Sequence, residues 1–564
     1  MKKSFLLLTL LCGALSAWAH DAEVDGIFYD LNEADKTATV TFKGDSYDAY
    51  DDEYAGDVVI PKAVTYNGIT YSVTSLGDNC FFNCSSLTSV TIPNSVTSLG
   101  VDCFEDCSRL ERVVVDAANP VYDSRENCNA IIHTATNNLV AGCKNSKIPN
   151  SVTSLGDRCF YECRNLTSIT IPNSVTSLGY ACFNGCSSLT SITIPNSVTS
   201  LGGSCFEGCS SLTSIKIPNS VTSLGYACFD GCSSLSSITI PNSVTSLGVG
   251  CFSSCSSLER IVVDATNPVY DSRENCNAII HTSTNEIVGG CKNSKIPNSV
   301  TSLGDHCFYG CSSLTSITIP KSVTSVGVAY FSGCSSLERI VVDAANPVYD
   351  SRENCNAIIH TATNKLVAGC MNSKIPNSVT RLEDCCFTGC SSLTSITIPN
   401  SVTSLGVDCF KGCNSLTSIT LPNSVTCLGD WCFAGCSSLA SITIPNSVMS
   451  LGDWCFYGCS SLTSIAIPNS VTSLGDACFW VCSSLTSITL PNSVTSLGTL
   501  CFSRCSSLTS IYMLPSTPPS TEYGIFDNTP LETVYVVDEN AKKAYQAKNP
   551  WNKYKIVVKP TGIK

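Results

Sequence analysis

The sequence predicts a repeat solenoid built from 23-residue coils, with a parallel β-sheet on one face. The segment 174–196, SVTSLGYACFNGCSSLTSITIPN, recurs at a fixed period of 23 residues, and further copies open at Ser197, Ser220 and Ser243. Six more copies follow, which open at Ser378, Ser401, Ser424, Ser447, Ser470 and Ser493. A unit this short cannot bury its own apolar side chains, so we expect neighbouring units to stack into one elongated array.

The apolar residues within each copy predict the strand of this sheet. In residues 151–173, Leu166, Ile169 and Ile171 have the spacing L-x-x-I-x-I, and the alternation of the two isoleucines is typical of a strand with one buried face. Pro172 cannot donate a hydrogen bond to the next coil, so it is expected to end the strand. Parallel strands connected in this way should coil right-handed.

The other half of each coil is predicted to contain a bend and a short helical turn. In the copy that opens at Ser174, Val175 and Leu178 add two inward-facing residues, and Gly179 allows a tight bend. The segment 182–186, C-F-N-G-C, fits a short helical turn that directs its phenylalanine into the core.

Residues 1–19 have the features of a cleaved secretory signal, with a basic start, an apolar run at 5–11 and an Ala-Trp-Ala site at 17–19. The apolar run is too short to span a bilayer as a helix. Lipid attachment at Cys12 is disfavoured, since Leu11 stands where a small residue is needed. The chain is therefore predicted to be exported, as a secreted or cell-surface protein without a membrane span.

The array is predicted to occupy residues 72–514, between an N-terminal cap at 20–71 and a C-terminal cap at 515–564. Strands are expected at 27–30 and 37–42 in the first cap. Polar caps cover the apolar ends that a stack of coils would otherwise expose.

Each cap has further recognisable parts. The N-terminal cap contains an acidic, tyrosine-rich run at 45–57 and an Asn67-Gly68 pair, which is the favoured sequence of a hairpin turn. In the C-terminal cap, residues 538–547 should form a short amphipathic helix, and Trp551 with residues 556–558 should close the end.

Much of the net charge of −13 lies in the N-terminal cap, where residues 20–57 contain 12 acidic residues and 2 lysines. An acidic chain without a basic stripe is not expected to bind nucleic acid, because that affinity comes from cations on phosphates. The acidic run could bind calcium, but it lacks the EF-hand spacing, and a solvated loop is the favoured interpretation. Its members are Asp45, Asp48, Asp51, Asp52 and Glu53.

Three repeats are lengthened to 56 residues by copies of one insert, and they span 95–150, 243–298 and 322–377. In the first insert, residues 130–133 and 139–141 read as strands, so each insert is predicted to add a β-hairpin to the solenoid. A hairpin centred on Ala135 and Thr136, and its equivalents in the other inserts, places two cysteines opposite each other as a candidate disulfide. A shift of one residue in this register would separate them onto opposite faces. The candidate pairs are Cys128/Cys143, Cys276/Cys291 and Cys355/Cys370.

The chain has 38 cysteines, most of them in C-F-x-x-C pairs such as Cys159/Cys163. Buried thiols are the favoured interpretation, because Tyr330 replaces one cysteine, which leaves Cys334 alone, and Cys427 stands outside the pairs. Disulfides between coils stay open as an alternative, since a stacking distance of about 4.8 Å lies within the Cα range that a disulfide accepts. A metal site needs four convergent ligands, and that context is absent.

The predicted strands place serine and threonine on their exposed side, which gives long rows of hydroxyl groups on the sheet face. This candidate binding face is formed by Ser168, Thr170, Ser191, Thr193, Ser395, Thr397, Ser418, Thr420, Ser441 and Thr443. No sequence motif of a hydrolase, metalloprotease or phosphate-binding loop is present. His133, His281 and His360 are one insert position copied three times, so no catalytic, cofactor-binding or metal-binding residue is predicted.

The repeat L-x-x-I-x-I-P-N-S-V-T-S-L-G-x-x-C-F-x-x-C resembles the BspA-like class of bacterial leucine-rich repeats over residues 72–514. It departs from that class where alanine usually precedes phenylalanine, because cysteine stands there in nearly every copy. Asn173 also lies seven residues after Leu166 rather than eight, so a buried asparagine ladder is not expected. The resemblance implies a non-enzymatic exported protein that binds an extracellular protein, such as a host matrix protein, and acts in adhesion. The alternative is capture of a glycan by the serine and threonine face.

Overall fold

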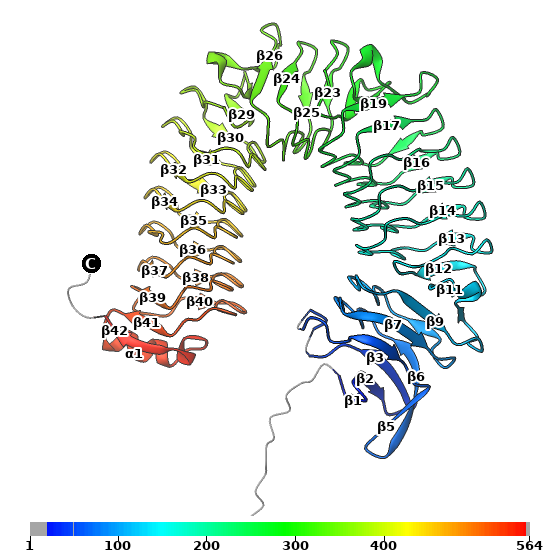
Figure 1. Ribbon diagram of the computed structural model, residues 1–564. Coiled ribbons are helices and arrows are strands. Elements are labelled where there is room, and N and C mark those ends of the chain that lie inside the picture. The colour runs from blue at the N-terminus through cyan, green and yellow to red at the C-terminus, as the bar shows by residue number, and fades with distance from the viewer. Residues whose placement is uncertain (1–19, 45, 49, 560–564) are drawn as a thin grey trace, which may run out of the picture. The chain divides into compact units, whose positions relative to one another are not determined.

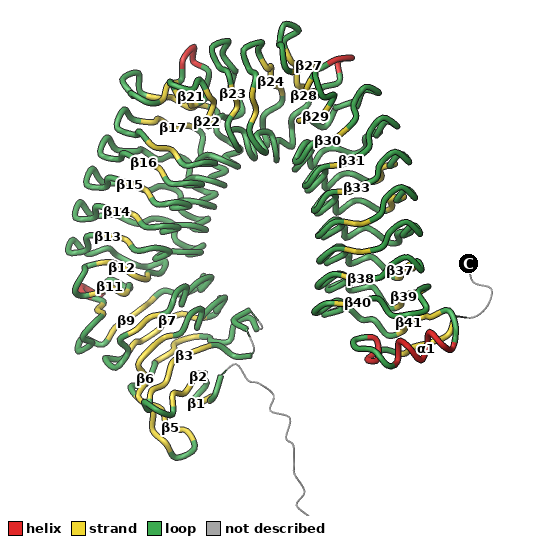
Figure 2. Tube along the Cα trace, turned by 180° about the vertical axis from the view of Figure 1, so that it is seen from behind, coloured by secondary structure: helices red, strands yellow, loops and turns green. Residues whose placement is uncertain are grey.

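The computed structural model describes residues 20–44, 46–48 and 50–559, and the chain divides into two compact units, Met1–Leu212 and Thr213–Lys564. The predicted secretion signal and Asp45 lie outside the described residues. Within each unit, successive repeats lie side by side as coils, one coil for each 23-residue repeat (Figure 1). Most of each coil is turn or loop, and strands occupy only short segments (Figure 2).

The first unit opens with a sheet of order β1-β2-β3-β6-β5, and β8 also pairs with β6. The strands are β1 (Ala22–Val24), β2 (Ile27–Asn32), β3 (Thr37–Thr41), β5 (Ala63–Tyr66), β6 (Ile69–Leu76) and β8 (Ser98–Leu99). The hairpin turn between β5 and β6 places Asn67 and Gly68 at positive φ, 52° and 80°, as an Asn-Gly turn requires. The predicted strands and the hairpin of the N-terminal cap are confirmed.

Parallel strands of the predicted L-x-x-I-x-I segment stack from coil to coil. In the first unit they are β4 (Gly56–Val59), β7 (Leu87–Ile92) and β9 (Arg112–Val115). In the second unit they form four sheets, β17-β19, β24-β26, β32-β34 and β37-β39-β41-β42. Their bounds are β17 (Ser237–Ile240), β19 (Arg260–Val263), β24 (Ser316–Ile319), β26 (Arg339–Val342), β32 (Ser418–Thr420), β34 (Ser441–Thr443), β37 (Ser487–Leu490), β39 (Ser510–Met513), β41 (Thr533–Val536) and β42 (Lys555–Val558).

A second parallel ladder runs along each unit. It is formed by the Ser-Leu dipeptide of the repeat's Ser-Leu-Gly segment. In the first unit it comprises β13 (Ser154–Leu155), β14 (Ser177–Leu178) and β15 (Ser200–Leu201). In the second unit it comprises β16 (Ser223–Leu224), β18 (Ser246–Leu247), β23 (Ser302–Leu303), β25 (Ser325–Val326), β30 (Arg381–Leu382), β31 (Ser404–Leu405), β33 (Cys427–Leu428), β35 (Ser450–Leu451), β36 (Ser473–Leu474), β38 (Ser496–Leu497) and β40 (Ser520–Thr521). The sequence did not predict these strands, because two residues are too few to show a period of two.

Each insert adds three strands and one turn of 3₁₀-helix, and its last strand joins the Ser-Leu ladder of the next coil. The first insert contains β10 (Tyr122–Asp123), η1 (Arg125–Asn127), β11 (Ile131–His133) and β12 (Asn138–Ala141). The others contain β20 (Tyr270–Asp271), η2 (Arg273–Asn275), β21 (Ile279–His281), β22 (Glu286–Gly289), β27 (Tyr349–Asp350), η3 (Arg352–Asn354), β28 (Ile358–His360) and β29 (Lys365–Ala368). The predicted β-hairpin is confirmed in all three inserts.

The C-F-x-x-C segments form single turns, so the predicted short helical turn is present as isolated turns and does not extend into a helix. Alternate backbone N–H groups donate to the next coil, as from Ala181 to Gly203 O at 2.8 Å and from Phe183 to Cys205 O at 2.8 Å. Other N–H groups of the segment donate three residues back along the chain, as from Cys186 to Phe183 O at 3.2 Å. The residue before the first cysteine has a positive φ, 50° at Ala181, so the chain enters the turn in the left-handed region. We call these segments the C-F turns.

The core runs along each unit as stacked rows of identical side chains. Phe160, Phe183 and Phe206 lie face to face in the first unit, with ring centroids 5.2 and 5.5 Å apart. In the second unit the same row continues without a break from Phe387 to Phe526. Each coil therefore buries its apolar residues against its neighbours, as expected for a solenoid.

The C-terminal end is closed by α1 (Glu539–Gln546), η4 (Trp551–Lys553) and β42. The Asp538 side chain caps α1 by accepting a hydrogen bond from Ala541 N at 2.7 Å. Tyr545 and Trp551 are both 0% exposed and pack edge to face at 5.3 Å. The predicted helix and the closing tryptophan are confirmed.

Candidate functional site

The predicted hydroxyl rows lie on the solvent side of the L-x-x-I-x-I strands. All ten serine and threonine residues of the candidate face are exposed, and the isoleucines between them are buried. Pairing keeps the rows in register, as between Thr170 and Thr193 in the first unit and between Thr420 and Thr443 in the second. The row ends in two stacked tyrosines, Tyr512 and Tyr535, with ring centroids 4.7 Å apart.

The cysteines of the C-F turns are buried thiols in this structure. Of the 37 cysteines in the described residues, Cys427 is exposed, Cys163 and Cys385 are partly exposed, and all others are buried. Neighbouring sulfur atoms are in contact without forming a disulfide bond, as are Cys159 Sγ and Cys182 Sγ at 3.4 Å. Burial raises the pKa of these thiols, to about 12 at Cys505 and well above the usual value at Cys182. They therefore pack as small apolar residues and do not form the reactive thiolate.

This arrangement predicts the pattern of thiol alkylation. In native protein at pH 8, brief iodoacetamide treatment is expected to modify Cys427, because it alone among the 37 is classed as exposed. After denaturation without reductant, all 37 thiols should react, and intact mass should show 37 additions on the mature chain. A deficit of two or more additions would identify disulfides and contradict the thiol assignment.

The insert cysteines sit on either side of a β-bulge. Pairing of Ile132 with Leu139 follows the predicted register, but Ile131 pairs with Ala141, so the register shifts by one residue before the cysteines are reached. The Cys143 Sγ donates to Asn129 O at 3.3 Å.

In the third insert the two cysteines belong to different parts of the core. There, Cys355 belongs to the core cluster of the following coils and Cys370 to that of the preceding coils. Both are thiols in the structure, so the cross-strand disulfide stays a prediction for the alkylation experiment to test.

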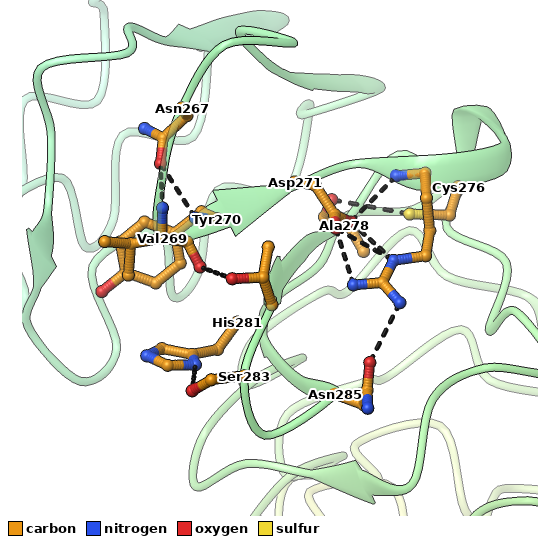
Figure 3. A network of polar contacts seen from close by, with 11 residues as sticks. Asn267, Val269, Tyr270, Asp271, Cys276, Ala278, His281, Ser283 and Asn285 are labelled. Carbon is orange, nitrogen blue, oxygen red and sulfur yellow. Dashed lines mark hydrogen bonds and ion pairs between the residues drawn. The ribbon is translucent and has the colours of Figure 1, made fainter.

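A network of polar contacts holds each insert in place, and Figure 3 shows it for the second one. Asn267 is buried, accepts hydrogen bonds from the N–H groups of Val269 and Tyr270 at 2.9 and 2.8 Å, and donates to two carbonyl groups of the preceding coil. Arg273 pairs with Asp271 at 2.6 Å and donates to Asn285 at 3.0 Å. Because these polar groups bond one another, the network serves the structure of the insert.

The repeated insert histidine is also accounted for by packing. His133, His281 and His360 lie edge to face against Tyr122, Tyr270 and Tyr349, with ring centroids 5.5 to 5.7 Å apart. A hydroxyl bonds one of them, from Ser283 to His281 Nδ1 at 3.2 Å. The edge-to-face contact with a tyrosine is the feature that all three copies share.

Several carboxylates of the acidic run bond the first coil of the array. Asp52 accepts hydrogen bonds from Ser85 Oγ and Ser86 N at 3.0 and 2.7 Å, and Asp51 accepts one from Asn83 at 2.6 Å. They therefore attach the cap to the array. Over residues 20–44, 46–48 and 50–559, no group of three or more His, Cys, Asp or Glu side chains is arranged to hold a metal ion.

The structure also reveals an aromatic patch that sequence reasoning missed, formed by Trp431, Trp454, Tyr457 and Trp480 on successive C-F turns of the second unit. The indoles of Trp431 and Trp454 stack with centroids 4.6 Å apart and an angle of 2° between the planes. Trp480 meets Trp454 edge-on at 5.0 Å and Tyr457 at 5.2 Å. All four side chains are partly exposed.

Two cations flank the aromatic patch, and its backbone is strained. Lys411 Nζ lies 4.5 Å from the centroid of Trp431, and the Arg504 guanidinium lies 5.7 Å from that of Trp480. Trp431 and Trp454 both have φ of 57°, a conformation that is unfavourable for a bulky residue. The sequence sign of the patch was tryptophan at 431 and 454, where most other copies have a small or polar residue.

The comparisons with known proteins agree with the fold. A family model described as the BspA type leucine rich repeat region matches residues 62–137, 131–259, 285–357, 368–453 and 435–547. A search of curated proteins found no match. The described part of the chain contains no helix of the length and hydrophobicity needed to cross a membrane.

Solved structures of similar proteins include a leucine-rich cell surface protein from Faecalibacterium prausnitzii, which is 26% identical, with 79% of this chain and 93% of that chain covered and a TM-score of 0.36. A leucine-rich repeat protein from Bacteroides ovatus is 24% identical, with 95% and 100% covered and a TM-score of 0.33. The pneumococcal vaccine antigen PcpA is 15% identical, with 96% and 98% covered and a TM-score of 0.36. The family model matches well over half of the chain, and the chain therefore belongs to the BspA-type leucine-rich repeat family.

Proposed function

We propose that this chain is an exported, non-enzymatic protein that binds an extracellular protein through the aromatic patch of its second unit. The observation that carries the proposal is the stacking of Trp431 on Trp454 at a partly exposed surface. Export rests on the predicted signal at residues 1–19, and a role in adhesion fits a repeat protein of this family.

The chemistry of the patch is that of a protein-binding hot spot. Such hot spots are enriched in tryptophan, tyrosine and arginine, and the patch combines three tryptophans with Tyr457 and the nearby Arg504. The left-handed backbone at Trp431 and Trp454 costs about 1–3 kcal/mol at each residue. Ala181 has the same left-handed backbone at this repeat position, so the fold does not require tryptophan there, and a gain in binding would account for it.

Truncation of Trp454 tests this proposal. The wild-type mature chain would be screened against extracellular-matrix proteins and cell surfaces, and its affinity for the partner found there measured by surface plasmon resonance. Trp454→Ala should weaken that binding by about 30-fold or more, since a central hot-spot residue is worth about 2 kcal/mol or more. Tyr226→Ala, an exposed aromatic of the same unit outside the patch, should bind like the wild type. Equal losses in both variants, or none in Trp454→Ala, would contradict the proposal.

The exposed, in-register threonine row favours a second candidate, capture of a glycan by the sheet face. Thr397, Thr420 and Thr443 are adjacent in this row, and lysine at all three would place bulky charges on it. Glycan capture predicts that the triple variant loses binding to a glycan array while its thermal unfolding is unchanged. Binding through the aromatic patch predicts that the same variant keeps its protein partner.

A further inference from the structure

The three inserts interrupt the stack of C-F turns, because each insert adds a coil that lacks such a turn. Instead, the insert coil passes close to the following phenylalanine, where Gly142, Gly290 and Gly369 donate to the carbonyl groups of the next C-F turn at 2.7 to 2.8 Å. As a result, the C-F turn before each insert faces the C-F turn after it across the insert coil.

In the second and third inserts these two facing turns close onto each other. Ser254 N donates to Tyr309 O at 2.9 Å, and Gly333 N donates to Thr388 O at 2.9 Å. This closure depends on the glycine that follows the accepting residue, Gly310 or Gly389. A Cβ on Gly310 would lie 2.6 Å from the Cα of Ser254, and a Cβ on Gly389 would lie 2.6 Å from the Cα of Gly333.

The first insert has different residues at both of these positions. Glu162 replaces the glycine, and Asp106 stands where the other inserts have Ser254 and Gly333. Because Glu162 carries the Cβ that closure forbids, the two turns stay apart, and Arg164 bridges them by pairing with Asp106 at 2.9 Å and with Glu162 at 3.1 Å. A cavity of about 510 Å³ lies beside this bridge, whereas the cavity at the third insert is about 230 Å³.

The walls of the larger cavity are acidic and aromatic. Beside apolar residues and cysteines, its lining includes three carboxylates, one guanidinium and two tyrosines: Asp102, Glu105, Asp157, Arg158, Tyr161 and Tyr180. Arg158 forms an ion pair with Asp102 and lies 5.3 Å from the ring centroid of Tyr161. Asp157 accepts a hydrogen bond from Tyr180 N at 2.7 Å.

Glu105 is the carboxylate that these contacts leave available. It is partly buried, and no hydrogen bond to its carboxylate occurs within the described part of the chain. Asp102 and Asp106 approach it from its own turn, and Arg158 and Glu162 approach it from the facing turn. Burial first, and then repulsion by the nearby acids, raises the pKa of Glu105 to about 7.

We propose that this cavity binds a small organic cation, a primary ammonium or guanidinium group, with Glu105 as its counter-ion and Tyr161 as an aromatic wall. The cavity has room for such a group and its alkyl chain, and a cation there both neutralises the Glu105 carboxylate and gains cation–π attraction. The same group can arrive on a free amine or on a lysine or arginine side chain of a peptide. The site lies within the first unit and is independent of the aromatic patch.

Calorimetric titration of the mature chain at pH 8 tests the site with three probes: 1,5-diaminopentane, N-acetyl-lysine amide and the uncharged N-acetyl-norleucine amide. We expect one or both amines to bind and the norleucine amide not to bind. A preference for the diamine indicates a free-amine ligand, and a preference for the lysine amide indicates a peptide side chain. Glu105→Gln should weaken amine binding at least about tenfold, as loss of a charged partner does.

A matched control uses Glu207, which occupies the same repeat position as Glu105 in an uninterrupted coil of the same unit. Glu207→Gln should bind the amines like the wild type. The double variant Asp106→Ser with Glu162→Gly recreates the residues of the second insert, and it should lose amine binding while its circular dichroism is unchanged. Glu105→Gln should still bind the extracellular protein partner of the aromatic patch, which would show that the amine site and the adhesive function are independent.

The dependence on pH gives a further readout. The amine binds only when Glu105 is ionised, and the pKa of Glu105 in the empty cavity is about 7. The affinity of the cavity for the amine should therefore rise about tenfold from pH 6 to pH 8. In Glu105→Gln this pH dependence should disappear. The proposal is overturned if the norleucine amide binds as well as the lysine amide, if neither amine binds, or if Glu105→Gln and Glu207→Gln behave alike.

Discussion

Replacing Phe410 with alanine is expected to lower the free energy of unfolding of the second unit by about 3–5 kcal/mol. Phe410 is 0% exposed and lies between Phe387 and Phe433, with ring centroids 5.2 and 5.6 Å away. Its loss leaves a cavity inside the row and removes contacts to both neighbouring coils at once. Since each coil of a solenoid is stabilised by its neighbours, the defect affects both interfaces.

Urea unfolding followed by circular dichroism, with hydrogen exchange to locate the change, measures this effect. Val407→Ala is the control, because Val407 belongs to the same coil but is 40% exposed, and its truncation should change stability by at most about 0.5 kcal/mol. Faster exchange should appear first in the coils that contain Phe387, Phe410 and Phe433. Similar losses in the two variants would show that the phenylalanine row does not hold the coils together.

Replacing Gly290 with alanine is expected to destabilise the second insert by about 1–3 kcal/mol through overpacking. A Cβ at this position would lie 2.1 Å from Cε1 of Phe308, a separation that no real contact has. The backbone at Gly290 is not in the left-handed region, so the cost comes from this collision alone.

The adjacent glycine provides a matched control for that variant. At Gly289 a Cβ would have its nearest neighbour at 3.5 Å, and the other inserts carry alanine at this position, Ala141 and Ala368. Gly289→Ala should therefore leave the free energy of unfolding nearly unchanged. Phe308→Leu should reduce the cost of Gly290→Ala in a double-mutant cycle, and an additive result would contradict the collision as its cause.

The parts of the fold that a periodic pattern specifies were predicted from the sequence. The L-x-x-I-x-I strands, the insert hairpins, the Asn67-Gly68 turn and the C-terminal helix all follow from local rules of burial and turn chemistry. The C-F turn was predicted as a local turn, but its alternate hydrogen bonds to the next coil were not, because its sequence shows only the buried phenylalanine.

The candidate sites divide in the same way. The hydroxyl rows lie where the strand alternation predicted them, on the exposed side of the sheet. The aromatic patch was not predicted, because it lies on the C-F turns, whose side-chain directions follow from hydrogen bonds between coils and not from a strand alternation.

The sequence by itself determined the repeat, the residues that face the core and the residues that face solvent, because these depend on spacing within one coil. The tertiary structure decided what happens between coils: the bulge beside the insert cysteines, the aromatic patch, and the cavity at the first insert. The physical reason is that the space available to a side chain is set by the atoms of the coil that stacks on it. The Cβ of Glu162 therefore separates the open turns of the first insert from the closed turns at Gly310 and Gly389.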